Sequence, residues 1–141
     1  MADSTTPPNN AMMSVAASAM RAQQARMRVI AENMANADSV SKTAGGDPYR
    51  RQVPVFAPVM LPDGSQGVQM TKVAPDQTAF RSQYQPGHPS ADAKGYVKLP
   101  NVDPLVEALD MREAQRAYEA NLNVIETAKT MATDTINLLN K

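Results

Sequence analysis

Two long stretches without proline or glycine, one at each end of the chain, limit what this sequence can fold into more than any other feature. Residues 11–38 and 105–141 contain neither residue, whereas residues 39–100 hold eight of the 11 prolines and all six glycines. Proline removes a helix hydrogen bond and glycine weakens a helix, so a long helix is excluded from the middle of the chain. We therefore expect a helix, an insert of short strands and loops, and a second helix.

Hydrophobic and small residues in both end segments recur every seven residues, as they do along the seam of a coiled coil. The first repeat consists of Met13, Met20, Met27 and Met34, with Ala16, Gln23, Ile30 and Ala37 three places later. The second repeat consists of Met111, Tyr118, Ile125, Ala132 and Leu139, with Ala114, Asn121, Ala128 and Thr135 between them. Because the insert turns the chain around, these seams predict an antiparallel helix pair with both termini at one end.

Local signals divide the chain into four segments. Residues 1–10 are polar and contain two adjacent prolines, which predicts a disordered tail. Residues 11–38 form the predicted N-terminal helix, residues 39–100 the β-rich insert, and residues 101–141 the C-terminal helix. Asp103 followed by Pro104 is a typical helix start, since an acidic cap accepts free N–H groups and proline suits the first turn.

Four β-prone segments lie among the prolines and glycines of the insert, at residues 50–56, 67–73, 78–84 and 95–99. Residues 62–65 (Pro-Asp-Gly-Ser) have the composition of a tight turn. The sequence therefore predicts an α+β fold, in which two long paired helices flank a small, loop-rich antiparallel β insert. Such a small sheet depends on the helices or on neighbouring molecules for its stability.

Composition excludes several classes of function. The charges balance at 14 basic and 14 acidic residues without a basic stripe, which argues against nucleic-acid binding. No stretch approaches the roughly 20 apolar residues of a membrane span, and the N-terminus lacks the pattern of a Sec signal. Cysteine is absent. We expect no nucleic-acid partner, membrane span or disulfide.

The single histidine is the strongest candidate for a catalytic residue, but the evidence for such a role is weak. His88 lies in a Pro-Gly-His-Pro segment with Asp92 nearby, but no nucleophile motif accompanies it and too few ligands for a metal are present. We interpret it as a loop residue and expect no catalytic site, cofactor or metal. Arg50 and Arg51 form a short basic pair, which we expect to be solvated or to contact another subunit.

A seam rich in alanine and polar residues buries little apolar surface, so the isolated chain should be only marginally stable. The missing burial would come from other subunits, which favours a structural subunit of a polymer. A closed coiled-coil adaptor or export chaperone remains an alternative, and an enzyme is a third class supported only by His88 and scattered acids.

Four blocks of sequence resemble the flagellar basal-body rod family, and within it the proximal-rod subtype. They are residues 16–20 with 30–37 (Ala-Ala-Ser-Ala-Met and Ile-Ala-Glu-Asn-Met-Ala-Asn-Ala), 45–51 with 53–56, 84–97, and 114–121 (Ala-Gln-Arg-Ala-Tyr-Glu-Ala-Asn). Asn33 and Asn36 match the asparagines of the helix motif that rod and hook proteins share. The third block, beginning Tyr-Gln-Pro-Gly-His-Pro, is the most specific. The sequence departs from the family at Met34 and Ala19, and in the loop of residues 38–44.

The resemblance implies a non-enzymatic subunit, made in the cytoplasm and exported by the flagellar type III apparatus. It would fold on joining a helical, periplasm-spanning tube that transmits torque, with copies of itself and neighbouring rod proteins as partners. The residues expected at the assembly interface are Met13, Met20, Met27, Ile30, Asn33, Met34, Asn36, Met111, Tyr118, Asn121, Ile125 and Leu139.

Overall fold

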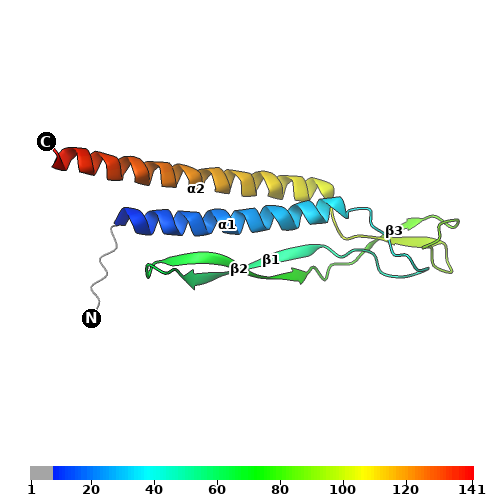
Figure 1. Ribbon diagram of the computed structural model, residues 1–141. Coiled ribbons are helices and arrows are strands. Elements are labelled where there is room, and N and C mark those ends of the chain that lie inside the picture. The colour runs from blue at the N-terminus through cyan, green and yellow to red at the C-terminus, as the bar shows by residue number, and fades with distance from the viewer. Residues whose placement is uncertain (1–7) are drawn as a thin grey trace. The chain divides into compact units, whose positions relative to one another are not determined.

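The computed structural model describes residues 8–141 and contains two long helices and four strands (Figure 1). In chain order these are α1 (Pro8–Ala35), β1 (Gln52–Met60), β2 (Gln66–Pro75), β3 (Arg81–Tyr84), β4 (Tyr96–Leu99) and α2 (Pro104–Leu139). The strands form two two-stranded antiparallel sheets, β1–β2 and β3–β4, and the long terminal helices pack together. The predicted α+β fold is confirmed.

The chain divides into two compact units, which we describe separately. The terminal unit contains the described residues up to 26, residues 55–72 and residues 113–141. The insert unit contains residues 27–54 and 73–112. No helix within residues 8–141 is long and apolar enough to cross a membrane.

In the terminal unit, α1 lies between α2 on one side and the β1–β2 hairpin on the other (Figure 1). Ala16 is buried toward α2, as the seam predicts. Ser18, Ala22 and Ala25 are also buried, and they share a second face of α1 because they are spaced three and four residues apart. The Ser18 hydroxyl accepts a hydrogen bond of 3.3 Å from the backbone N–H of Val68 in β2, so this second face holds the hairpin.

The hairpin approaches α1 closely where Gly67 of β2 faces Ser18 of α1. A Cβ atom placed on Gly67 of β2 would lie 2.5 Å from the Ser18 hydroxyl oxygen and 3.0 Å from Leu61 Cδ1. At the end of the hairpin, the N–H of Leu61 donates to the carbonyl of Ser65 and Gly64 has a φ of 84°. Asp63 Oδ1 accepts the N–H of Ser65 at 3.0 Å, which confirms the predicted turn.

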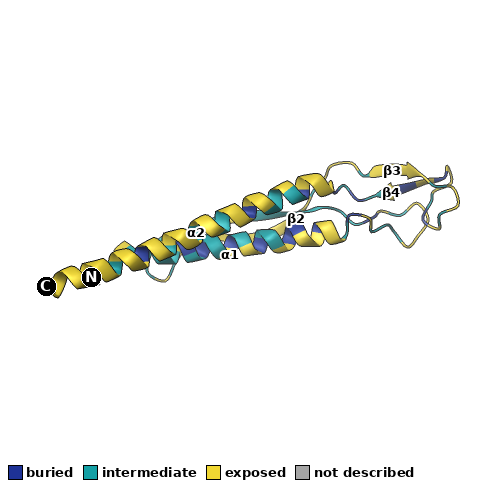
Figure 2. Cartoon of the chain, turned by 90° about the horizontal axis from the view of Figure 1, so that it is seen from above, coloured by how far each residue is buried: buried dark blue, intermediate teal, exposed yellow. Residues whose placement is uncertain are grey.

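The seven-residue repeat predicted for α2 matches its burial from Met111 to Ala132. Every repeat position in that range is buried or half-buried, whereas most residues between them are exposed (Figure 2). Ala114 and Ala128 have no exposed surface. Beyond Ala132, the repeat residues Thr135 and Leu139 are exposed. The seven-residue repeat of α2 therefore continues past the part of the helix that the rest of the chain covers.

In the insert unit, β3 pairs with β4 in the register Arg81↔Leu99 to Tyr84↔Tyr96. The rings of Tyr84 and Tyr96 meet edge to face at a centroid distance of 5.2 Å. Gly95 precedes this pair with a φ of 86°, and an added Cβ would lie 2.9 Å from the Tyr84 ring. Val97, at 1% exposed, anchors the sheet in the core of the unit together with Val102.

The boundaries of the elements differ from prediction by a few residues. α2 begins as expected, with Asp103 Oδ1 accepting the N–H of Leu105 at 3.0 Å. α1 begins at Pro8 and ends at Ala35, so residues 8–10 of the predicted disordered tail are helical. The rest of that predicted tail, residues 1–7, lies outside the described residues. All four predicted strand pieces overlap a strand.

Candidate assembly surface

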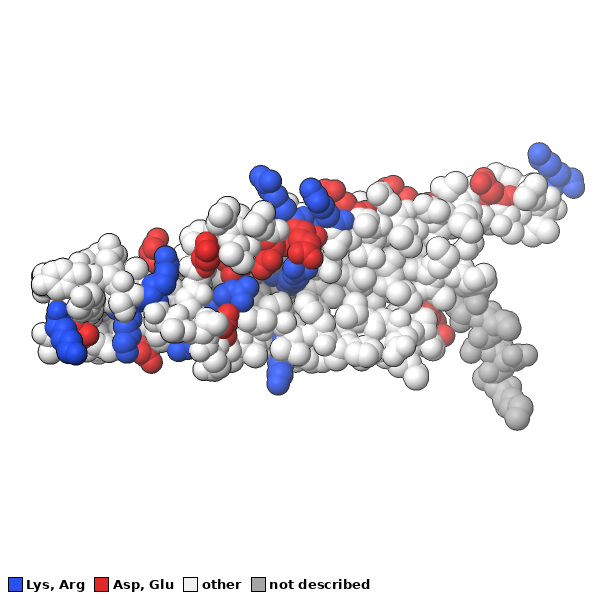
Figure 3. All heavy atoms as spheres, turned by 180° about the vertical axis from the view of Figure 1, so that it is seen from behind, with Lys and Arg blue, Asp and Glu red and all other residues white. Residues whose placement is uncertain are grey.

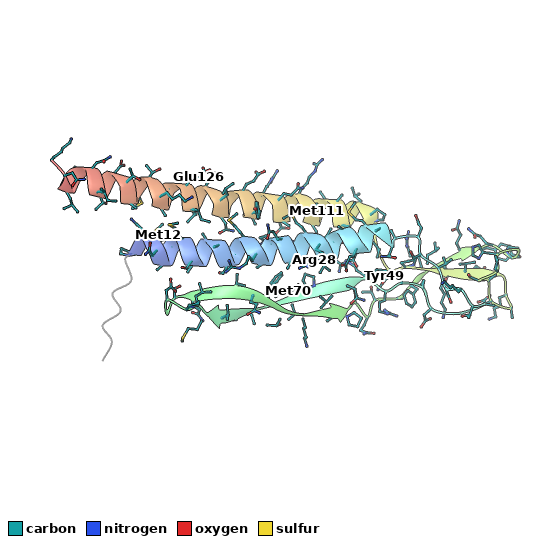
Figure 4. All side chains as sticks on the ribbon, viewed as in Figure 1. Met12, Arg28, Tyr49, Met70, Met111 and Glu126 are labelled. Carbon is teal, nitrogen blue, oxygen red and sulfur yellow. The ribbon has the colours of Figure 1, made fainter. Side chains whose placement is uncertain are left out.

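The surface of the terminal unit is poor in charge over much of both helices. No Asp, Glu, Lys or Arg occurs between Pro8 and Met20 of α1. From residue 117 to the end of α2, the charged residues are Glu119, Glu126, Lys129 and Asp134. At about 100° per residue, Glu119, Glu126 and Asp134 lie away from the seam, whereas Lys129 lies at its edge. Figure 4 shows Glu126 on the side of α2 that faces away from α1. On the face drawn in Figure 3, much of this unit is without Lys, Arg, Asp or Glu.

An apolar groove runs beside the helix seam within this uncharged region. Its volume is about 440 Å³, and its lining consists of Pro8, Ala11, Met12, Val15, Ala16, Asn121 and Val124. Asn121 is the only polar residue of the seven. Met12, Val15 and Val124 are each more than a third exposed. An apolar side chain from another molecule could be buried in this groove without displacing a charge.

Aliphatic side chains are exposed along the C-terminal half of α2. They are Leu122, Val124, Met131, Ile136, Leu138 and Leu139. Exposure is largest at the end of the helix, where Leu138 is 70% and Leu139 is 79% exposed. Contiguous exposed apolar residues in a protein commonly mark an interaction surface.

The predicted interface residues occupy three kinds of environment. Ile30 and Asn33 are buried, and Met34 and Leu139 are exposed. The half-buried members are Met13, Met20, Met27, Asn36, Met111, Tyr118, Asn121 and Ile125. Most of the predicted set thus already contacts its own chain, and the groove and the end of α2 add exposed residues such as Met12, Val15 and Leu138. These exposed residues lie outside the seven-residue repeat, and the sequence indicates them only by the small number of charged residues nearby.

Asn33 anchors the first strand to the first helix. Its Nδ2–H donates to the carbonyl of Gln52 at 2.8 Å, and its Oδ1 accepts the N–H of Gln52 at 2.9 Å. The same Oδ1 accepts the Tyr49 hydroxyl at 2.7 Å. The asparagine side chain therefore pairs with Gln52 as a neighbouring strand would, and at 1% exposed it is shielded from solvent.

The Tyr49 hydroxyl keeps its proton in this arrangement. Burial, and then the negative charges of Glu32 and Glu107, raise the pKa of Tyr49 above its usual value. The phenol consequently remains a donor to Asn33 at neutral pH.

Asn36 and Asn121 hydrogen-bond near their own positions in the chain. Asn36 Nδ2 donates to the carbonyl of Glu32, and its Oδ1 accepts the hydroxyl of Ser39, so it closes the end of α1. Asn121 Nδ2 donates to the carbonyl of Ala117 at 2.7 Å, and the residue also lines the groove. The asparagine motif of α1 is therefore explained in part by local structure.

Arg51 is the centre of an ion-pair network that the sequence did not reveal. Its Nε donates to Glu107 in the first turn of α2, and its Nη1 donates to Asp76 Oδ2 at 3.2 Å. A third carboxylate, Asp110, lies 3.5 Å from Nη2. The backbone N–H of Arg51 donates to Asn101 Oδ1. The network joins the residue before β1, the residue after β2 and the start of α2.

Burial by itself would lower the pKa of Arg51, but hydrogen bonds and charges from Glu107 and Asp76 raise it above its usual value. The N–H of Thr78, and further Arg51, hold the pKa of Asp76 below its usual value. Arg50 donates to the carbonyls of Asp76 and Thr78 and lies 4.1 Å from the centre of the Phe80 ring. The pair is therefore not merely solvated, because both guanidinium groups bind within the chain; contact of the pair with another subunit stays a prediction.

His88 forms a hydrogen bond within its own loop. Its Nδ1 accepts the backbone N–H of Ser90 at 3.0 Å, and the Ser90 hydroxyl donates to the carbonyl of Ser41. Within residues 8–141, no group of three or more His, Cys, Asp or Glu side chains could hold a metal ion.

Both ends of the chain match models of flagellar protein families. Residues 13–41 match the family described as flagella basal body rod protein, and residues 93–138 match the C-terminal family of flagellar basal body rod FlgEFG proteins. Individual relatives cover nearly the whole chain. The flagellar basal-body rod protein FlgC of Agrobacterium fabrum is 42% identical over 133 residues, which is 94% of this chain and 96% of the relative.

The FlgC protein of Escherichia coli O157:H7 is 43% identical over 125 residues, covering 88% of this chain and 92% of its own. That of Borreliella burgdorferi is 39% identical and covers 90% of this chain and 95% of its own. The similarity therefore includes both helices and the insert between them.

Proposed function

Because the chain belongs to the FlgC family of flagellar basal-body rod proteins and is a structural component of that rod, we propose that it assembles through the uncharged surface of its terminal unit. Membership of the family implies assembly with other rod proteins. The contacts would be made by the exposed and half-buried residues of α1 and α2, including Met13, Met20, Ile125 and Leu139. No catalytic step is part of this function.

The observation that carries the proposal is the uncharged stretch that both helices share. An apolar groove of about 440 Å³ and a row of exposed aliphatic side chains lie on this surface. Charged residues are typically depleted from the core of an interface, because burying an unpaired charge is costly. The exposed apolar row of Val124, Met131 and Leu138, which recur every seven residues along α2, is suited to burial against other subunits.

The core of the terminal unit supports the same conclusion, because it is made of small side chains. The buried hydrophobic residues of this unit are all alanines, namely Ala16, Ala22, Ala25, Ala114 and Ala128. The larger aliphatic side chains of the same helices, such as Leu122 and Ile136, stay exposed. Burial of alanine removes little apolar area from water. Burial of the larger side chains between subunits would therefore supply a large share of the stability of the terminal unit.

We further propose that folding of the terminal unit is coupled to assembly, after export through the flagellar type III apparatus in a largely unfolded state. Helices that bury little surface within their own chain unfold easily and gain stability when neighbours cover them. In the assembled rod, copies of this chain and neighbouring rod proteins would cover α1 and α2, and dense helix packing would carry torque.

A pair of substitutions on neighbouring residues of α2 tests this function. Met131 is 48% exposed on the uncharged side, and Thr130 is exposed on the side that carries Glu126. Met131→Asp should abolish rod assembly and motility while leaving the helicity of the purified chain unchanged, because the charge becomes buried only in the rod. Thr130→Asp is the matched control and should support normal motility. Normal rods with Met131→Asp would show that this surface is not an assembly interface.

A further inference from the structure

The seam of α2 continues beyond the segment that α1 covers. Thr135 and Leu139 occupy seam positions but are exposed, and Ile136 beside them is 58% exposed. Among the described residues, α1 begins only at Pro8, and the end of α2 extends past it in Figure 1. The last turn of α2 thus presents aliphatic side chains in the same register as the intact seam, with no described helix opposite them.

The groove of the terminal unit is chemically matched to these side chains. Among residues 8–141, its lining contains no charged residue, and no charged residue follows Asp134 in α2. An engineered apolar cavity of roughly 150 Å³ in another protein accepts a benzene molecule. The groove, at about 440 Å³, therefore has room for more than one aliphatic side chain. Ile136 and Leu139, which lie one turn apart on the same side of α2, are suited to fill it together.

The end of α2 cannot fill the groove of its own chain. Val124 lines the groove, and Leu139 lies near the end of the same helix. The two residues are about four turns apart, which is roughly 22 Å at a rise of about 1.5 Å per residue. The helix is uninterrupted between them, since it contains no proline or glycine there. The groove and the end of α2 can therefore meet only between two molecules.

We propose that the last turn of α2, through Ile136 and Leu139, binds in the groove beside Met12, Val15 and Val124 of a second copy of this chain. This proposal rests on the assembly function above and specifies one of its contacts. The two surfaces differ, so each copy uses its groove for one neighbour and its helix end for the next. Such a heterologous contact extends an open row of subunits, whereas a self-complementary contact would close into a dimer.

Cysteine cross-linking tests the contact directly, because the chain contains no cysteine of its own. In motile cells whose rods contain the double variant Met12→Cys and Leu139→Cys, oxidation by copper phenanthroline should give a ladder of products at multiples of the chain mass. A mixture of the two single variants should stop at the dimer. Asn137→Cys in place of Leu139→Cys is the control, since this exposed residue lies on the opposite side of α2 from Leu139 and should not cross-link.

Motility separates failure of this contact from failure of the assembly function. Motile cells without a ladder, or with a product that contains only a different rod protein, would overturn the proposed contact and leave the assembly function in place. If the cysteine variants do not assemble, opposite charges introduced at the two positions give a second test. Met12→Lys and Leu139→Glu should each reduce assembled rods at least tenfold, and their combination should restore them to within threefold. Failure of either single variant to reduce assembly, or of the pair to restore it, would also overturn the contact.

Discussion

Replacement of Asn33 by alanine should destabilise the insert unit more than any other single asparagine substitution in α1. The side chain makes three hydrogen bonds, two with the backbone of Gln52 and one with the Tyr49 hydroxyl, at 2.7–2.9 Å. A hydrogen bond contributes about 1 kcal/mol net, and buried groups left without a partner add to the loss. Asn33→Ala should therefore lower the free energy of unfolding by about 3 kcal/mol.

Urea unfolding of the purified chain, followed by tyrosine fluorescence, measures this effect. The chain has no tryptophan, and three of its four tyrosines (Tyr49, Tyr84 and Tyr96) lie in the insert unit, so the signal reports mainly on that unit. With a denaturant slope of about 1.5 kcal/mol per M, the midpoint should fall by about 2 M. If the parent chain is less stable than this, the variant should be unfolded without urea.

Asn36→Ala is the matched control, because Asn36 has the same side chain at the end of the same helix. Its hydrogen bonds to Glu32 and Ser39 are local and partly exposed, so the loss should stay below about 1 kcal/mol. Equal midpoints for the two variants would refute the anchoring role of Asn33. Unchanged unfolding combined with loss of rod assembly would instead place Asn33 at a contact between subunits.

Three further substitutions have expected outcomes that the same unfolding measurement checks. Arg51→Ala leaves its fully buried glutamate partner in α2 unpaired and should lower stability by about 3–5 kcal/mol. The exposed Arg112→Ala should have little effect, and similar midpoints for the two arginine variants would contradict the network. Gly67→Ala should lower stability by about 1–3 kcal/mol, because its Cβ would collide with α1. Gly87→Ala meets no neighbouring atom and should change stability by no more than about 0.5 kcal/mol; equal losses at the two glycines would exclude the close approach. Asp76 has a pKa below its usual value in the folded chain. Its carboxylate therefore stabilises the fold at pH values above the pKa of an unfolded aspartate, about 3.9, and this stabilisation is lost as the pH falls through the lowered pKa. Asp76→Asn should flatten that acid limb, and an unaltered pH profile would argue against the contribution.

In the proposed function, the exposed apolar side chains of the helix pair are what other subunits contact. α2 uses one side of its surface within the chain and keeps a second, apolar row exposed, formed by Val124, Met131 and Leu138. The β1–β2 hairpin covers the opposite face of α1, so α1 has less surface left for other subunits. We expect substitutions in α2 to act mainly on assembly and those in α1 to act on both folding and assembly.

Much of the candidate surface could be predicted from the sequence, but its division between internal and external contacts could not. The seven-residue repeats identified Met20 and Ile125 as seam residues, and both are half-buried. They could not show that Leu139 lies beyond the covered part of the seam, because that depends on where α1 begins opposite α2. They also missed the groove, which requires side chains from both helices.

The sequence by itself determined the elements of this protein, since helices, turns and caps depend on residues a few positions apart. The spacing of apolar residues, the distribution of proline and glycine, and the cap at Asp103 were enough to locate both helices and the hairpin turn. Only the tertiary structure decided which polar residues hold the elements together. Asn33 binds a residue 19 positions away and Arg51 binds one 56 positions away, and no local pattern encodes such pairings. The second buried face of α1 was missed for the same reason, because Ser18, Ala22 and Ala25 are buried only when a hairpin distant in sequence packs on them.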